Sequence, residues 1–225
     1  MASDTQRQLL GVCAVALWLA LVSGGALLLR SRWPQQKEWS RKLVHIGSGA
    51  VVLLAWGFGI NRTIALGSAL IATLLTSLNH RFQLLGAIED VGRHSYGTIA
   101  YGASISLLLA LFWPQQPAAV AAGVLVMAVG DGLAGLLGAG FHSPGWILWG
   151  QNKSLLGTAT MAAASLAVLA SLSLASTGAN GLAVAAPALL LITLVATLLE
   201  QIAVAGLDNF TVPVAVGLLW SQLST

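Results

Sequence analysis

The sequence predicts an all-α fold, a polytopic membrane bundle of seven or eight transmembrane helices. Two observations support this prediction. Of the 225 residues, 57% are hydrophobic and only 8% are charged, whereas a soluble domain of this size needs more charge to cover its surface. Apolar runs also recur along the whole chain, and about 20 helical residues cross the hydrocarbon core of a bilayer. We expect residues 1–225 to form one integral membrane domain.

The predicted helices follow from these runs in chain order. The first run is 22 residues long and is followed by far more positive charge than precedes it, so it is expected to be a retained anchor rather than a signal peptide. The polar stretches 30–42 and 79–97 are loops of ordinary size. The runs cover residues 8–29, 43–60, 63–78, 98–113, 117–138, 155–176, 182–199 and, more briefly, 210–223.

The charged residues predict the orientation of the chain. Five cations, Arg30, Arg32, Lys37, Arg41 and Lys42, share one loop, and the positive-inside rule places such a loop in the cytoplasm. Eight alternating crossings then bring most acids to the same face. A pump or channel needs polar groups throughout the bilayer, so we expect chemistry at the cytoplasmic face. The net charge of +3 does not indicate a nucleic-acid partner, because this one loop accounts for much of it.

The segment that opens the second run places three residues on one predicted helix face. Arg41, His45 and Gly49 lie at i, i+4 and i+8, so a cation and an imidazole face a seam where glycine permits close packing. The alternative for Arg41 and Lys42 is a role in topology and lipid phosphate contact. The alternative for His45 is a hydrogen-bonded helix residue.

A second anion-binding element precedes the fourth run. Arg93 has the planar guanidinium that suits a phosphate, and Ser95 and Thr98 add hydroxyl groups beside two glycines. A solvated turn capped by threonine is the alternative.

Asp131 is the most informative residue of the chain. A carboxylate inside an apolar helix costs roughly 2.5–3.5 kcal/mol, so it usually faces protein or trapped water. Glycines at positions 130, 132, 135, 138 and 140 surround it, and they allow helices to nest or backbone amides to meet phosphates. Because Mg²⁺ prefers oxygen ligands, we expect Asp131 to bind a magnesium–nucleotide complex, with Gly132 near the phosphates.

The start of the sixth run complements Asp131. Lys153 and Ser154 place an ammonium and a hydroxyl at a predicted helix N-terminus, which favours anions. The spacing of Gly145 and Gly150 is similar to that of a P-loop, but Lys153 comes two residues late and no buried parallel strand precedes it. A P-loop is therefore excluded.

The last polar segment, residues 200–213, adds further acids. Glu200 and Asp208 flank the inner end of the seventh run, and Asp208 with Asn209 supplies oxygen ligands. Taken alone, Asp208 and Asn209 also fit a turn and helix cap. Glu200, Asp208 and Asp131 would be three converging acids, which repel one another unless a cation lies among them.

With these residues in view, the chain resembles the polyprenol kinase family, most closely the phytol kinases of photosynthetic organisms, over about residues 38–213. The resemblance lies in five motifs that occur in order. Leu156 departs from the family pattern, which usually has an acid at that place, and the glycine tract lacks an arginine often found there. The motifs cover residues 41–47, 93–98, 130–134, 152–158, and 200 with 208–213.

The resemblance implies a kinase that transfers the terminal phosphoryl group of CTP, or of UTP or ATP, to a long isoprenoid alcohol such as phytol. The product would feed tocopherol or phylloquinone synthesis. The implied partners are the alcohol, the nucleoside triphosphate and the lipid bilayer, with no nucleic acid. The implied location is the plasma or thylakoid membrane of a photosynthetic organism, with the active site facing the cytoplasm.

Phosphoryl transfer needs charge neutralisation and a positioned hydroxyl, and together with the resemblance this gives each candidate a role. The metal ligands for Mg²⁺ are expected to be Asp131, Asp208 and Asn209. The catalytic residues are expected to be His45, Asp131 and Glu200, with His45 or Glu200 receiving the alcohol proton. The nucleotide and phosphates are expected to contact Arg41, Lys42, Arg93, Gly132, Lys153, Ser154, Gly157 and Thr158.

Three other functions are weighed against the kinase. A membrane cytidylyltransferase of the phosphatidate type remains open. A CDP-alcohol phosphotransferase is disfavoured, because it needs two further aspartates soon after Asp131 and the next acid is Glu200. A small-solute transporter would place ionisable residues near the midplane and broken helices in both halves, and neither pattern is evident.

Overall fold

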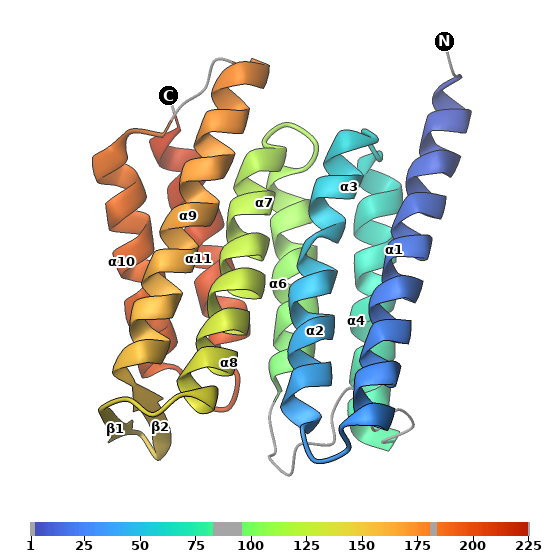
Figure 1. Cartoon of the computed structure of the whole chain (residues 1–225). Helices are drawn as coiled ribbons and strands as arrows, with labels where there is room; N and C mark the ends of the chain where they lie inside the picture. Colours follow the sequence, from blue (N-terminus) through green and yellow to red (C-terminus); the bar gives the residue numbers. More distant parts are fainter. Residues whose placement is uncertain (1–2, 83–95, 181–183, 225) are drawn as a thin grey trace.

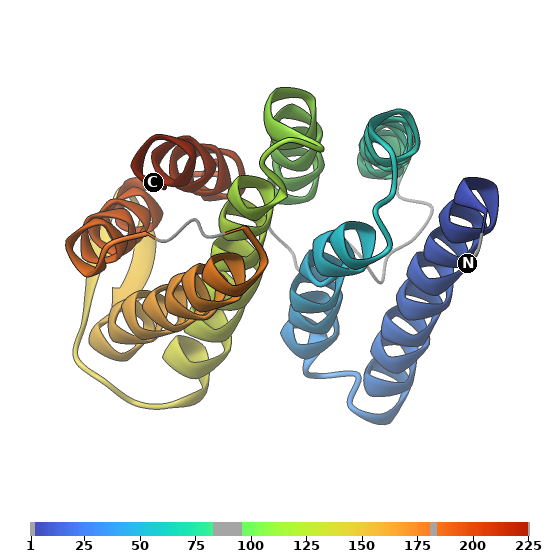
Figure 2. The ribbon, with the colours of Figure 1, turned by 90° about the horizontal axis from the view of Figure 1, so that it is seen from above.

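The computed structural model describes residues 3–82, 96–180 and 184–224. These residues form a bundle of helices that run alongside one another, with α1 (Asp4–Arg32) at one edge and α9 to α11 at the other (Figures 1 and 2). Arg93, the predicted phosphate-binding residue of the inner loop, lies outside the described residues. The other helices are α2 (Lys37–Gly49), α3 (Val51–Gly57), α4 (Arg62–Phe82), α6 (Gly97–Phe112), α7 (Pro117–Leu125), η1 (Val126–Asp131), α8 (Gly132–Gly140), α9 (Leu155–Asn180), α10 (Ala186–Ile202) and α11 (Asp208–Leu223).

The helical class and the membrane character agree with the sequence. Within the described ranges, four helices are long and apolar enough to cross a bilayer, and two shorter apolar helices accompany them. The predicted number of seven or eight crossings stays a prediction. The long segments are Asp4–Arg32, Arg62–Phe82, Pro117–Gly140 and Leu155–Ser176, and the shorter ones are Gly97–Phe112 and Ala186–Ile202.

Two of the apolar runs are interrupted helices. The run 43–60 divides at Ala50 into α2 and α3. The run 117–138 begins with Pro117 in the first turn, where its missing N–H is not needed, and then widens into the π-helix η1 before continuing as α8. A π turn alters which carbonyls find a helical partner and re-aims the side chains beyond it. The widened turn ends on Asp131.

One short element within the helical fold is a β-hairpin. Strands β1 (Gly145–Leu148) and β2 (Gln151–Ser154) pair as an antiparallel hairpin. Trp149 with φ 51° and Gly150 with φ 74° form its two-residue turn, and positive φ at both positions matches the twist of paired strands. The glycines compared above with a P-loop therefore belong to this hairpin, and Lys153 lies on a strand rather than at a helix start.

The core surrounds the α7–η1 segment. Every residue from Ala119 to Leu125 is buried, and this column lies in the middle of the bundle in Figure 2. α11, α6 and α9 pack on it. Glycine permits the closest of these approaches, because a Cβ at Gly123 would overlap the Pro213 carbonyl oxygen of α11 and lie 2.8 Å from Leu108 Cδ1.

We expect Gly123→Ala to lower the free energy of unfolding by about 1–3 kcal/mol, the usual cost of overpacking a core. Thermal unfolding of the detergent-solubilised protein measures the change. Gly24→Ala is the matched control, because a Cβ at Gly24 meets nothing within 4 Å. Equal stability of the two variants would contradict the close α7–α11 contact.

Candidate active site

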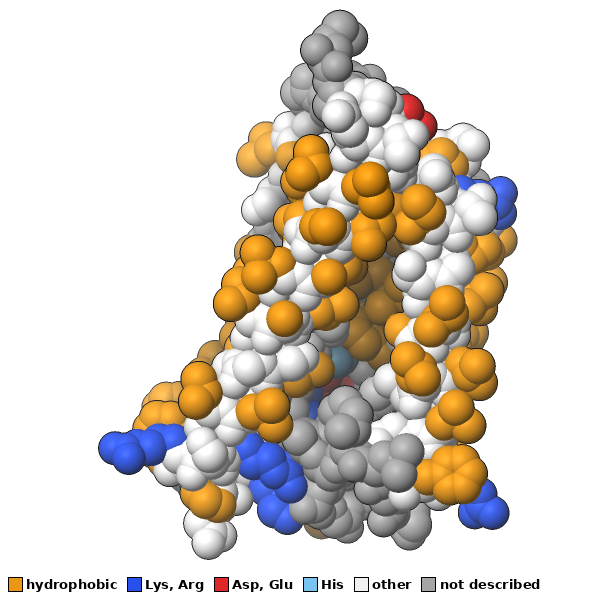
Figure 3. Space-filling view, turned by 90° about the vertical axis from the view of Figure 1, so that its right-hand side faces the viewer, with side chains coloured by type: hydrophobic (Ala, Val, Ile, Leu, Met, Phe, Trp, Pro, Cys, Tyr) orange, Lys and Arg blue, Asp and Glu red, His pale blue; other side chains and the backbone are white. Residues whose placement is uncertain are grey.

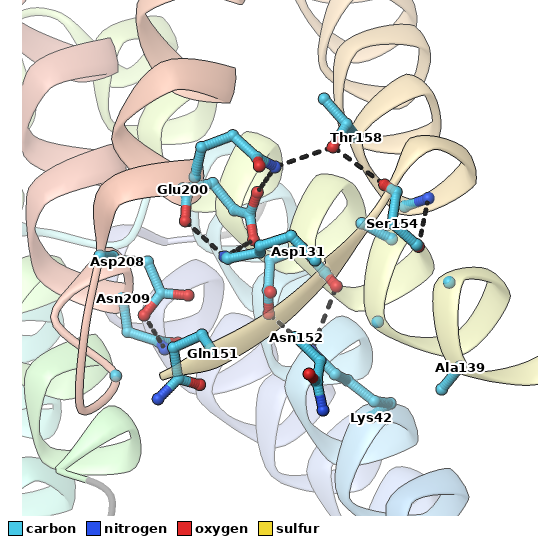
Figure 4. A pocket seen from close by; sticks show the side chains of 18 of the residues that line it. Lys42, Asp131, Ala139, Gln151, Asn152, Ser154, Thr158, Glu200, Asp208 and Asn209 are labelled. Carbon is cyan, nitrogen blue, oxygen red and sulfur yellow. Dashed lines mark hydrogen bonds and ion pairs between the residues drawn. The ribbon is translucent and has the colours of Figure 1, made fainter. Parts of the chain in front are cut away.

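A polar cavity of about 530 Å³ opens at the hairpin end of the bundle. α2, α8, β2, the start of α9, the end of α10 and the start of α11 all contribute to its wall (Figure 4). Sequence-distant charged residues therefore share one cavity. They are Glu38, Arg41, Lys42, Asp131, Lys153, Glu200 and Asp208.

Lys42 and Asp131 form a buried ion pair in this wall. Lys42 Nζ lies 2.6 Å from Asp131 Oδ2, and the side chains are 7% and 16% exposed. The same ammonium donates to the Asp131 backbone oxygen at 3.1 Å. Gly135 leaves the space for the lysine stem, because a Cβ there would lie 2.7 Å from Lys42 Cε. The ion pair thus joins α2 to the end of the π turn.

His45 lies beside Asp131 but does not line the cavity. Its Nε2 is 3.5 Å from Asp131 Oδ2 and 3.3 Å from the carbonyl oxygen of Met127 in η1. Both of these atoms are acceptors, which assigns the ring hydrogen to Nε2. Arg41, which the sequence places on the same helix face as His45, binds Glu38, and the cation that binds Asp131 is Lys42.

A second ion pair joins β2 to α10. Lys153 Nζ donates to Glu200 Oε1 at 2.5 Å and to the Glu200 backbone oxygen at 2.7 Å. Gln201 Nε2 donates to Glu200 Oε2 at 2.7 Å and to Thr158 Oγ1 at 2.9 Å. Both oxygens of Glu200 are therefore occupied. Gln201 was not a predicted site residue, although its place beside Glu200 at the end of an apolar helix was a usable signal.

The remaining predicted phosphate contacts have structural roles of their own. Ser154 Oγ accepts a hydrogen bond from the Gly157 amide at 3.1 Å and so caps α9. Thr158 Oγ1 donates to the Ser154 backbone oxygen at 3.0 Å. These three residues line the cavity. Gly132 does not, because it packs against Ile46 of α2.

Asp208 and Asn209 face the same cavity from the start of α11. Asn209 Nδ2 is 3.4 Å from Asp208 Oδ1. Asp208 precedes the apolar part of α11, and burial raises the pKa of its carboxyl to about 6, with the negative charges of Asp131 and Glu200 adding to the increase. The local field at Asp208 therefore favours a cation.

The acids do not form a closed metal cage. In the part of the chain that the structure describes, no group of three His, Cys, Asp or Glu side chains is close enough to hold a metal ion. The oxygens of Asp131 and Asp208 instead line one shared cavity. Such a donor set suits an ion that takes its other ligands from phosphate and water, as Mg²⁺ usually does.

Arg41 lies at the rim of the cavity. Its guanidinium binds Glu38 Oε2 through Nε at 3.0 Å and Nη2 at 2.8 Å, and the two side chains are 30% and 42% exposed. A partly exposed pair of this kind exchanges partners at little cost. Gln151 and Asn152 of the hairpin also line the cavity, although neither was predicted as a site residue.

The Lys42–Asp131 pair can be tested through stability. Lys42→Met should lower the free energy of unfolding by about 3–5 kcal/mol, because it leaves a buried carboxylate uncompensated. Adding Asp131→Asn should recover most of that loss. Denaturant unfolding in detergent measures both, with Lys37→Met, an exposed lysine of the same helix, as the control. Additive losses in the double variant would refute the direct pairing.

Comparison with curated proteins identifies the family. The chain is 36% identical over 211 residues to the phytol kinase of Synechocystis, which covers 93% of this chain and 90% of that protein. It is 28% identical over 221 residues to a probable chloroplastic phytol kinase of Glycine max, covering 88% and 72%.

A third relative is named for another alcohol. The chain is 29% identical over 169 residues to the chloroplastic farnesol kinase of Arabidopsis thaliana, covering 68% of this chain and 53% of that protein. No family model and no solved structure matches the chain. The identity and coverage shared with the cyanobacterial protein are decisive: this chain belongs to the polyprenol kinase family and is an enzyme that phosphorylates an alcohol.

Proposed function

We propose that the enzyme transfers the terminal phosphoryl group of CTP to the hydroxyl of phytol or a related isoprenoid alcohol. The observation that supports this most directly is that Asp131, Lys153 and Asp208, from three distant motifs, line one cavity. The names of the relatives support an isoprenoid acceptor, since two are phytol kinases and one is a farnesol kinase. They favour a kinase over the cytidylyltransferase and the transporter.

The charges of the cavity suit a triphosphate. Lys42 and Lys153 each hold an ammonium at the wall, bonded to Asp131 and Glu200 respectively. In the proposed complex, Lys153 turns toward phosphate oxygens, where a charge-assisted hydrogen bond replaces the one to Glu200. Arg41 at the rim gives a planar guanidinium for a second phosphate. Arg93, which lies outside the described residues, is another candidate to bind a phosphate.

Mg²⁺ fits the donor set of this cavity. Asp131, Asp208 and the side-chain oxygen of Asn209 would hold it, and it usually takes only one or two carboxylates together with phosphate oxygens. When bound, the ion would neutralise charge on the transferring phosphoryl group. The raised pKa of the Asp208 carboxyl is consistent with a place where a cation relieves repulsion between neighbouring acids.

Of His45 and Glu200, His45 is the better candidate to receive the alcohol proton. Both carboxylate oxygens of Glu200 accept hydrogen bonds, from Lys153 and from Gln201, so Glu200 could receive the proton only by giving up one of these bonds. Among the described residues, Met127 and Asp131 both contact His45 at Nε2, which leaves Nδ1 for the alcohol. In the proposed step the alcohol oxygen bonds to the γ-phosphorus, the bond to the bridging oxygen breaks, and the proton passes to His45.

The membrane arrangement follows from the charge pattern. We propose eight crossings, with α2 and α3 acting as one, so that the basic loop and the cavity face the cytoplasm. The alcohol would stay in the bilayer while the nucleotide arrives from water. The product, phytyl phosphate in the case of phytol, would serve tocopherol or phylloquinone synthesis in the plasma or thylakoid membrane of a photosynthetic organism.

The transfer is tested with purified protein and nucleotide labelled in its terminal phosphate. CTP, UTP and ATP are each combined with phytol, geranylgeraniol and farnesol, and we expect the highest rate with CTP. Asp131→Asn should lower kcat roughly 100-fold or more, because it removes charge stabilisation at the transferring group. Asp4→Asn, far from the cavity in the first turn of α1, should be fully active. Formation of CDP-diacylglycerol from CTP and phosphatidate, without alcohol phosphorylation, would overturn the proposal.

Metal dependence is tested separately. Chelation with EDTA should abolish activity, and added Mg²⁺ should restore it. Asp208→Asn should raise the Mg²⁺ concentration for half-maximal rate by at least ~10-fold, the loss typical when support for a bound metal is removed. Activity that persists in EDTA, or an unchanged Mg²⁺ requirement in the variant, would remove Asp208 from the metal site.

A further inference from the structure

A second, apolar hollow lies on the side of the bundle (Figure 3). α1 packs on α2 and α3, whereas α4 packs on α6. Figure 3 shows hydrophobic side chains along both flanks and a hollow between them, with a histidine and an acidic side chain visible in its depth. The hollow therefore brings an apolar surface close to a histidine and an acidic side chain (Figure 3).

The sequence of α2 and α3 explains the apolar character of this hollow. Gly47 faces α1, where a Cβ would lie 2.7 Å from Val22, and Ile46 faces Gly132 of α8. Helical periodicity leaves a third face at i, i+4 and i+7. This face carries half-buried Val44, Ser48 and Val51.

Tyr101 of α6 contributes a buried polar group beside His45. Its ring centroid lies 4.6 Å from that of His45, and the residue is only 7% exposed. Among the described residues its hydroxyl has no hydrogen-bond partner, although the Ser48 hydroxyl, which already donates to the His45 carbonyl oxygen, is a neighbour. A buried hydroxyl without a partner is costly, so a bound ligand that hydrogen-bonds to it would remove this cost.

The tautomer of His45 points to the same ligand. Nε2 carries the ring hydrogen, because it faces the Met127 carbonyl and the Asp131 carboxylate. Nδ1 is then the basic nitrogen, and no hydrogen bond to it is found among residues 3–82, 96–180 and 184–224. A basic nitrogen and a phenol hydroxyl side by side match an alcohol O–H, which donates to one and accepts from the other.

We propose that the acceptor alcohol binds on the side of Asp131 opposite the nucleotide, with its hydroxyl between Tyr101 and His45 and its isoprenoid chain in the hollow between α1 and α4. This inference rests on the proposed function and names the site of its second substrate. Tyr101 donates to the alcohol oxygen and positions it. His45 Nδ1 accepts the alcohol proton as the new oxygen–phosphorus bond forms and the bond to the nucleoside diphosphate breaks. The isoprenoid chain of the alcohol enters sideways from the bilayer.

The hydroxyl position is tested with Tyr101→Phe, which removes one oxygen and keeps the ring. We expect the KM for the alcohol to rise about tenfold, the effect of one lost hydrogen bond, with the KM for the nucleotide and the unfolding temperature unchanged. A tyrosine with only a structural role would change stability, or change both KM values together. Either result would overturn the assignment.

The position of the isoprenoid chain is tested with Val51→Trp in the same preparation. Val51 lies six residues beyond His45, or about 9 Å along the helix, so a bulky ring there should block a long chain and spare a short one. We expect at least a tenfold drop in kcat/KM for phytol and little change for prenol, an alcohol of one isoprene unit. Leu53→Trp on another face of α3, where Leu53 is 43% exposed, is the control.

The outcomes separate this inference from the proposed function. Active wild-type enzyme with unchanged chain-length preference in Val51→Trp would overturn the acceptor site and leave the kinase assignment intact. Wild-type enzyme that phosphorylates no isoprenoid alcohol would overturn both. Equal loss with phytol and prenol in Val51→Trp would show general damage rather than a blocked chain, and would also count against this site.

Discussion

The contact between Lys42 and Asp131 is the interaction on which the rest of the site depends. A carboxylate within an apolar helix is costly, and here a lysine from α2 approaches it to 2.6 Å. That approach requires the missing side chain of Gly135 and the π turn that ends at Asp131. Because the pair holds α2 against η1 and α8, it also fixes His45 beside the same carboxylate.

Asp131 lies between two environments of opposite character. On one side is the polar cavity with Lys153, Glu200 and Asp208, and on the other are His45 and the buried Tyr101. The proposed reaction needs such a boundary, because the nucleotide stays in water and the isoprenoid alcohol stays in the membrane. A packed helix interface with one charged pair across it provides this boundary without an open channel.

The hairpin and the loop before α11 complete the polar side. β2 carries Lys153 to Glu200, while the turn places Trp149, 71% exposed, at the hairpin end of the bundle. Tryptophan is favoured where membrane meets water, so this end is suited to the interface. Ala205 and Gly206 both have positive φ in the cavity wall, at 55° and 83°. Glycine adopts this conformation freely, whereas at Ala205 it is strained, and such strain is typical of functional loops.

The sequence by itself determined the helical membrane class, because burial cost and apolar patterning act locally along the chain. It also predicted one site for Asp131, Lys153, Glu200 and Asp208, and these residues line one cavity in the structure. Only the tertiary structure decided which side chains of the site contact one another. Lys42 rather than Arg41 meets Asp131, since which of two adjacent cations points inward depends on how α2 packs on α8. The hairpin around Lys153 and the nearness of Tyr101 to His45 arise from pairings between segments, and no local pattern encodes which distant segment will be the neighbour.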